Sequence, residues 1–118
     1  MATILLVEDD DILRLTAAHH LEKAGYTVIA MAKSNEALDQ LDLGRQIDLA
    51  VIDICMSPGQ VNGLALGRMA RWRRPGLPVV FVTGYPEVLK AEAIQEPVFL
   101  KPIDLGQLTE KIKEHLGA

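Results

Sequence analysis

Polar residues able to do chemistry follow four short apolar runs of this chain, each at the point where the run ends. They are Glu8, Asp9 and Asp10 after the first run, and then Asp53, Thr83 and Lys101. Carboxylates crowded at one place repel one another, and a proton or a cation relieves that repulsion. A shallow site of oxygen ligands suits Mg2+, which keeps several of its waters when bound. The pattern therefore predicts a Mg2+ site.

Such a site is suited to phosphoryl transfer. Mg2+ can bridge a carboxylate and an incoming phosphoryl oxygen, which offsets the charge of the anion. Lys101 is a compact cation for another phosphoryl oxygen, and the Thr83 hydroxyl can donate a hydrogen bond to a third. Asp53 would then be the carboxylate nucleophile that forms an acyl phosphate.

Each of these residues also has an ordinary structural explanation. Carboxylates after a first strand often cap the following helix, and an aspartate after a buried run can be a cap or turn residue. A threonine at a strand end is usually structural, and a lysine before proline is usually a solvated turn residue. Only the joint pattern, spread over four predicted strands, favours the functional interpretation.

The elements that must position these residues alternate between short apolar runs of β type and segments of helical period, which predicts a parallel sheet flanked by helices. The predicted strands are Thr3–Val7, Tyr26–Ala30, Leu49–Ile52, Val79–Val82 and Val98–Leu100. The predicted helices are Asp11–Ala24, Asn35–Leu41, Gly63–Arg73, Pro86–Ile94 and Asp104–Leu116. Five such units predict an α/β, doubly wound, flavodoxin-like fold with strand order 2-1-3-4-5.

Local signals support several of these boundaries. Gly25 stands where a glycine commonly ends a helix, and Ser34 and Asp104 are predicted N-caps. In the predicted order the second strand, followed by Met31-Ala32-Lys33, is the outlying edge, and the four strands that carry the polar residues are contiguous. All the candidates therefore converge on one crevice at the carboxyl ends of the strands, where open α/β sheets bind ligands.

Composition limits the classes of protein. The 118 residues, 49% of them apolar, predict one globular domain over residues 1–118. A net charge of −4 argues against a nucleic-acid-binding surface. The single cysteine, Cys55, excludes an internal disulfide and fits a reducing compartment. The first apolar run is too short for a signal sequence or a membrane span, so we expect a cytoplasmic protein without membrane contact.

At this point the chain resembles the receiver domain of two-component response regulators (CheY-like) over essentially its whole length. The matching segments are Ile4-Leu5-Leu6-Val7-Glu8-Asp9-Asp10, Leu49-Ala50-Val51-Ile52-Asp53, Val80-Phe81-Val82-Thr83-Gly84 and Phe99-Leu100-Lys101-Pro102. The resemblance implies that Asp53 is the phosphoacceptor, with Thr83 and Lys101 contacting the phosphoryl group. It also implies a cis bond between Lys101 and Pro102.

The resemblance further implies the metal ligands. Asp9 and Asp53 would bind Mg2+ directly, the backbone carbonyl of Cys55 would be the third protein ligand, and Glu8 would act mainly through a metal-bound water. The acidic run allows a shift of one residue. Asp53 lies 44 residues after Asp9, the spacing of the family, which favours Glu8 and Asp9 as the pair and leaves Asp10 as a helix-start residue.

Three features depart from the usual family pattern. Val98 replaces the Phe or Tyr that usually lies three residues before the phosphate-site lysine, so a switch through that ring cannot operate. Phe81-Val82-Thr83-Gly84-Tyr85 resembles a subfamily with a Phe-Ala-Thr-Gly…Tyr motif that includes single-domain regulators. There the switch would lie at Gly84 and Tyr85, although Tyr85 could equally cover the edge of the core. Finally, the loop 56–63 is two residues longer than usual.

The expected function is therefore a phosphoacceptor switch that catalyses only its own phosphorylation and dephosphorylation. A histidine kinase or phosphotransfer protein would be the donor, and the output would be a contact with a separate, unidentified protein through the fourth and fifth strands and helices. The chain would be a monomer or a phosphorylation-dependent dimer. A phosphate sink and a receiver excised from a hybrid kinase stay open, although Met1 directly before the first strand favours a natural start and the end of the chain leaves no space for an output domain.

Three other functions fit the sequence less well. A related Mg2+-dependent phosphatase would usually carry a second aspartate two residues after its nucleophile, where this chain has Cys55. A flavodoxin would need a phosphate-binding loop after the first strand, where three acids would repel the phosphate. The intact set of Asp9, Asp53, Thr83 and Lys101 counts against an unphosphorylated scaffold.

Overall fold

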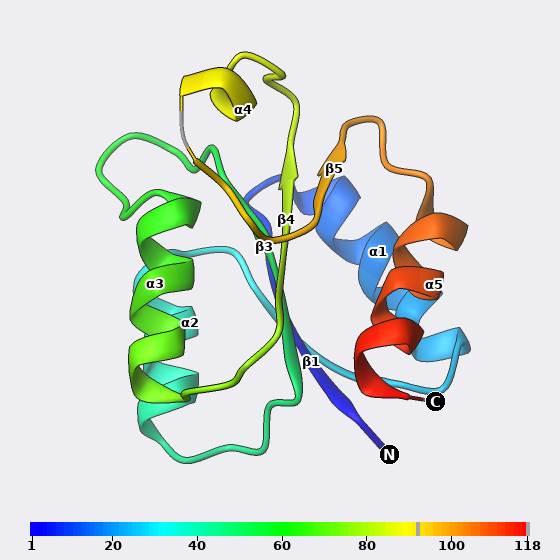
Figure 1. The fold of residues 1–118 in the computed structure, drawn as a ribbon. Helices are drawn as coiled ribbons and strands as arrows, with labels where there is room; N and C mark the ends of the chain where they lie inside the picture. Colours follow the sequence, from blue (N-terminus) through cyan, green and yellow to red (C-terminus); the bar gives the residue numbers. More distant parts are fainter. Residues whose placement is uncertain (92, 118) are drawn as a thin grey trace.

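A computed structural model describes residues 1–91 and 93–117 of the chain and contains a five-stranded parallel sheet (Figure 1). Its strands are β1 (Thr3–Val7), β2 (Thr27–Met31), β3 (Leu49–Asp53), β4 (Val79–Thr83) and β5 (Val98–Leu100). They are ordered β2-β1-β3-β4-β5. The predicted fold class and strand order are confirmed.

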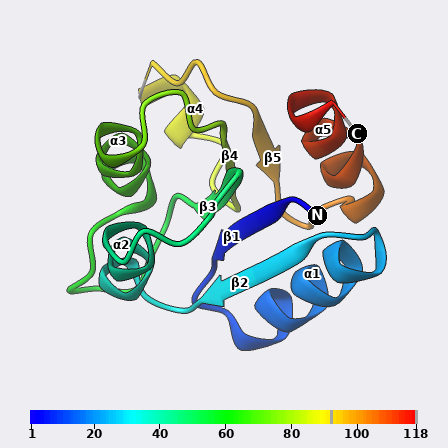
Figure 2. The ribbon, with the colours of Figure 1, turned by 90° about the horizontal axis from the view of Figure 1, so that it is seen from below.

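Helices cover both faces of the sheet (Figure 2). α1 (Asp11–Lys23) and α5 (Leu105–Leu116) lie on one face, and α2 (Ser34–Asp42) and α3 (Gly63–Arg73) lie on the other. Each pair packs on its own cluster of buried side chains. Leu21, Leu49 and Ile112 belong to the cluster under α1 and α5, and Ile52 and Leu66 belong to the cluster under α2 and α3. The central strands are thus buried on both faces, as their continuous hydrophobicity predicts.

The strand ends differ from the prediction in a way that matters for the site. β3 and β4 extend one residue further than predicted, so Asp53 and Thr83 are the last residues of their strands. Their backbones are therefore fixed by the sheet, which holds both side chains rigidly. β2 is displaced by one residue from the predicted Tyr26–Ala30.

Two of the predicted helix boundaries are confirmed and one is wrong. The Asp104 side chain accepts a hydrogen bond from the Gln107 amide at 3.0 Å and caps α5, and Gly25 follows α1 with φ of 103°. Ser34 is not the N-cap of α2, because that position is Lys33, which makes no capping bond with its side chain. The Ser34 hydroxyl instead donates to the Val61 carbonyl at 2.6 Å, since its side chain is buried against the loop after β3.

The fourth helix is much shorter than the predicted Pro86–Ile94. α4 covers only Val88–Ala91, residues 93–95 are not helical, and Glu92 lies outside the described residues. None of the α4 residues is buried, and a helix of this length has too few backbone bonds to be stable without packing. Among the described residues, no helix has the length and apolar character needed to span a bilayer.

Candidate functional site

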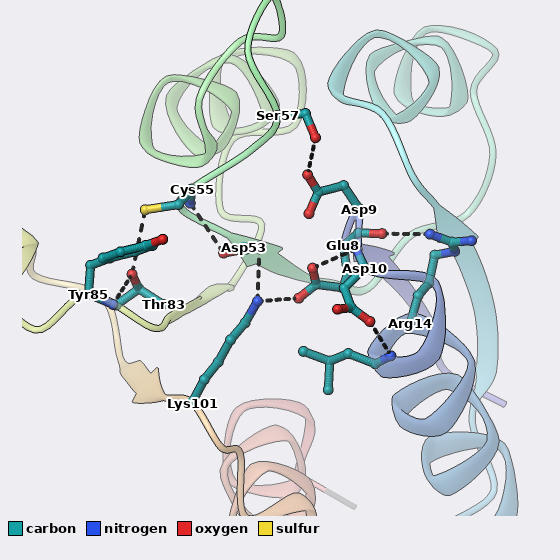
Figure 3. Close-up of polar contacts among 11 residues, drawn as sticks. Glu8, Asp9, Asp10, Arg14, Asp53, Cys55, Ser57, Thr83, Tyr85 and Lys101 are labelled. Carbon is teal, nitrogen blue, oxygen red and sulfur yellow. Dashed lines mark hydrogen bonds and ion pairs between the residues drawn. The ribbon is translucent and has the colours of Figure 1, made fainter.

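The predicted carboxylates meet at the carboxyl edge of the sheet (Figure 3). Glu8 and Asp9 directly follow β1, and Asp53 ends the neighbouring β3. One oxygen from each of these three side chains lies within 4.8 Å of the others. The strand order therefore brings together residues that are 44 positions apart in the sequence.

Asp53 is almost completely buried, with 3% of its surface exposed. Its Oδ1 accepts a hydrogen bond from the Cys55 amide at 3.2 Å, and its Oδ2 accepts one from Lys101 Nζ at 3.1 Å. These two bonds fix the carboxylate and leave its oxygens at the floor of the cleft. The arrangement presents a restrained oxygen nucleophile beside a cation.

Lys101 lies directly after β5 and bridges two carboxylates. Its Nζ is 3.0 Å from Glu8 Oε1 and 3.1 Å from Asp53 Oδ2. Burial alone would lower the pKa of Lys101, but the Glu8 and Asp53 carboxylates outweigh it and raise the pKa above its ordinary value. The Lys101–Pro102 bond is cis, as the resemblance implies. The sequence placed Lys101 at the site, but it gave no sign of the bond to Glu8.

Glu8 is the most strongly perturbed acid of the cluster. Burial raises its pKa to about 7, although the Asp10 amide and Lys101 act in the opposite direction and Asp53 adds to the rise. The Asp10 amide donates to Glu8 Oε2 at 3.0 Å. Near neutral pH Glu8 is therefore poised between a neutral acid and an anion, as expected for a carboxyl group with too little compensating charge.

Asp9 and Asp10 are adjacent in the sequence but make different contacts. The Ser57 hydroxyl donates a hydrogen bond to Asp9 Oδ2. Partial burial would raise the pKa of Asp9, but hydrogen bonding to Ser57 and Glu8 outweighs it and the pKa lies below its ordinary value. Asp10 Oδ1 accepts from the Leu13 amide at 2.9 Å and caps α1. Asp10 is thus the helix-start residue that the family spacing predicts.

Thr83 ends β4 and is fully buried. Its Oγ1 accepts a hydrogen bond from the Tyr85 amide at 3.1 Å and lies 3.7 Å from Cys55 Sγ. The Tyr85 side chain is 55% exposed and lines the cleft that contains Asp53 and Lys101. This position favours a role for Tyr85 at the site over a role in covering the core. Val98, by contrast, packs half-buried against the core cluster under α2 and α3.

The loop between β3 and α3 is held at several points. Its Ser57 contacts Asp9, its Gln60 side chain accepts from the Ser34 amide at 2.9 Å, and its Val61 carbonyl accepts from the Ser34 hydroxyl. Gly63 then begins α3 so close to β3 that an added Cβ would overlap the Asp53 carbonyl oxygen. The extra loop length was visible in the sequence, but these contacts were not.

The donor set fits a hard divalent cation. Three carboxylates offer oxygen ligands at one point, the cleft beside them includes Asp9 and Asp53, and Lys101 offsets only part of their charge. Oxygen ligands in this number, open to solvent on one side, are those that Mg2+ accepts while it keeps several waters.

Residues 4–113 match the model of the response regulator receiver domain family. The chain is 38% identical to a sensor kinase CckA of Brucella abortus, over 98% of this chain and 12% of CckA. It is 33% identical to the response regulator receiver protein CpdR of the same organism, over 100% of this chain and 99% of CpdR. The chain spans less than a third of the length of several curated relatives that it matches.

Solved structures agree with this assignment. A CheY-like receiver domain protein from Methanospirillum hungatei superposes with a TM-score of 0.86 at 31% identity, over 99% of this chain and 94% of that one. The response regulator TrrA from Thermotoga maritima, solved in complex with Mg2+-BeF, gives a TM-score of 0.82 at 26% identity, over 98% of this chain and 99% of TrrA.

Proposed function

This chain belongs to the response regulator receiver family of two-component signalling, and on that premise we propose that Asp53 accepts a phosphoryl group from the phosphohistidine of a kinase or phosphotransfer protein. The observation that carries the proposal is the position of Asp53. Its buried carboxylate lies 3.1 Å from the Lys101 ammonium group and beside the acids Glu8 and Asp9. A nucleophilic oxygen, a cation and a candidate metal site thus converge on one point.

The chemistry assigns a task to each residue. An Asp53 oxygen forms the new O–P bond while the N–P bond of the donor breaks, and the electron pair of that bond returns to the donor imidazole. Lys101 pairs with a phosphoryl oxygen, for which it must leave Asp53 Oδ2 or share it. The Thr83 hydroxyl accepts from the Tyr85 amide and lies 3.7 Å from Cys55 Sγ, and its own proton can turn to donate to another phosphoryl oxygen.

The same proposal covers the metal. Asp9, Asp53 and the Cys55 carbonyl would hold Mg2+, and Glu8 would act through a bound water. When bound, Mg2+ would offset the negative charge of the phosphoryl group. The cluster of three carboxylate oxygens and the Mg2+-BeF complex of TrrA support this assignment.

We also propose that the output is a contact with a separate protein, made by the surface of β4, α4, β5 and α5. Tyr85, Leu89 and Leu100 are exposed apolar or aromatic side chains of this surface. Because Val98 has no ring to turn inward, the signal would pass through Gly84 and Tyr85, which adjoin Thr83. The chain aligns with nearly all of CpdR, a response regulator receiver protein. We propose that residues 1–118 likewise act as a cytoplasmic receiver domain, as a monomer or a phosphorylation-dependent dimer.

Intact-mass measurement after incubation with Mg2+ and acetyl phosphate tests the proposal. The wild-type chain should gain one phosphoryl group, and Asp53→Asn should gain none. Asp39→Asn, which removes an exposed aspartate of α2, is the matched control and should behave as wild type. Addition of EDTA should stop the reaction. A phosphoryl group that persists in Asp53→Asn would show that another residue is the acceptor.

A further inference from the structure

Ser57 is the residue of the lengthened loop that reaches the site. Its hydroxyl donates to Asp9 Oδ2, and hydrogen bonding to Glu8 and to the Ser57 backbone also acts on the same carboxylate. In Figure 3, Ser57 approaches Asp9 from the side away from Lys101, and the second carboxylate oxygen faces Asp53 and Lys101. The hydrogen bond therefore holds one oxygen outward and directs the other inward.

The contact is supported by the loop that carries it. The Gln60 amide donates to the Ser57 carbonyl at 3.2 Å, and Gln60 and Val61 are both bonded to Ser34, whose surface is 1% exposed. Asn62 then caps α3 through the Ala65 amide at 2.9 Å. A loop fixed at these points holds the Ser57 hydroxyl in a defined place. The conformational entropy of the loop is therefore lost on folding, and little more is lost when Ser57 orients Asp9.

The geometry points to Ser57 as a positioning residue for the metal site: its hydroxyl orients the Asp9 carboxylate so that the inward oxygen is ready to bind Mg2+. This inference rests on the proposed function of the same site. Asp9 is only partly buried, so without Ser57 its side chain would sample rotamers that turn both oxygens away from Asp53. Groups that hold a metal ligand by hydrogen bonding typically change metal affinity by about 10- to 100-fold when removed.

Metal binding by the full chain, measured with Mn2+ by electron paramagnetic resonance and with Mg2+ by displacement of Mn2+, tests the inference. Ser57→Ala should bind both ions about tenfold more weakly than wild type. Ser57→Thr keeps the hydroxyl and should restore most of the affinity. Thr16→Ala is the matched control, because Thr16 is exposed on α1 and its hydroxyl donates to the Ile12 carbonyl, away from the site. Its affinity should equal that of wild type.

The rate of phosphorylation by acetyl phosphate supplies a second readout. For Ser57→Ala the Mg2+ concentration that gives half the maximal rate should rise about tenfold, while the rate at saturating Mg2+ stays within about twofold of wild type. Unchanged or tighter binding in Ser57→Ala would overturn the inference and leave the proposed function intact. A wild-type chain that binds neither ion would overturn both.

Discussion

At the scale of single residues, the site is organised around one cation between two buried acids. Lys101 contacts Glu8 and Asp53, whose side chains are 4% and 3% exposed. A charge pair in such a place stabilises the fold only if both members are present, because removal of one leaves the other buried without compensation. Without metal, Lys101 therefore has a structural task in addition to its proposed contact with the phosphoryl group.

Substitution of Lys101→Met should lower the free energy of unfolding of the metal-free chain by about 2 kcal/mol, since Glu8 and Asp53 lose their shared partner. Urea denaturation in EDTA measures this change. Mg2+ should restore part of the lost stability, because the dication supplies the missing positive charge. Lys113→Met on the exposed face of α5 is the control and should cost less than about 0.5 kcal/mol.

The raised pKa of Glu8 predicts a dependence of stability on pH. In the metal-free folded chain burial raises this pKa to about 7 from its ordinary value of 4.5. Between these pH values the folded state therefore holds a proton that the unfolded state has lost. Stability should therefore fall as the pH rises from 5 to 8, by up to about 3 kcal/mol from this group. Glu8→Gln cannot ionise and should lose less stability over the same range.

Urea titrations in EDTA at several pH values check this prediction. The stability of Glu8→Gln relative to wild type should rise as the pH goes from 5 to 8. Glu22→Gln, at an exposed glutamate of α1, is the matched control and should follow wild type. Parallel curves for wild type and Glu8→Gln would contradict the assignment.

For the helices and strands, periodicity and local signals predicted those elements whose positions are set by packing in the sheet. The runs Thr3–Val7 and Val98–Leu100 predicted the bounds of β1 and β5 without error. β1 is buried throughout, as a continuous apolar run predicts, whereas β5 at the sheet edge is only partly buried. The cap at Ser34 failed, since the loop after β3 competes for the same hydroxyl, a contact between segments 27 positions apart. Local helix-capping preferences cannot reveal a bonding partner that is distant in the sequence.

At the site, too, some features could be predicted from the sequence and others could not. Strand ends placed Asp53, Thr83 and Lys101 at one edge, because topology alone brings them there. The bond from Ser57 to Asp9 and the ion pair of Lys101 with Glu8 depend on rotamers and on the path of a loop, so they could be known only from the structure.

The start of α3 gives a prediction at this scale. Because an added Cβ at Gly63 would overlap the Asp53 carbonyl oxygen, Gly63→Ala should push α3 from the sheet and destabilise the chain by about 3 kcal/mol or more. Gly106→Ala on α5 is the control, since its nearest contact is Asp104 Oδ1 at 3.3 Å, and its effect should stay within about 1 kcal/mol. Urea denaturation of the two variants measures the difference.

At the scale of the whole molecule, metal binding and folding should be linked. The three acids come together only in the folded chain, so Mg2+ bound at the proposed site should stabilise the folded state. At ten times the dissociation constant the gain is about 1.4 kcal/mol. Thermal unfolding followed by circular dichroism should show a higher Tm with Mg2+ for wild type. Asp9→Asn, which weakens a proposed ligand, should show a smaller rise, and an equal rise in both would contradict the assignment of Asp9.

The close approach of α3 to β3 has a mechanical consequence for the whole domain. On the α3 side, the backbone of Asp53 is backed by Gly63, whose amide also bonds to the Ile54 carbonyl at 2.8 Å, and it has no room to recede. On the β4 side, Gly84 and Tyr85 are exposed. Movement of the Asp53 backbone toward α3 is therefore blocked, whereas the Gly84–Tyr85 segment beyond β4 faces solvent and has room to move. Any group attached to Asp53 should therefore shift the chain beyond β4 and leave α3 in place.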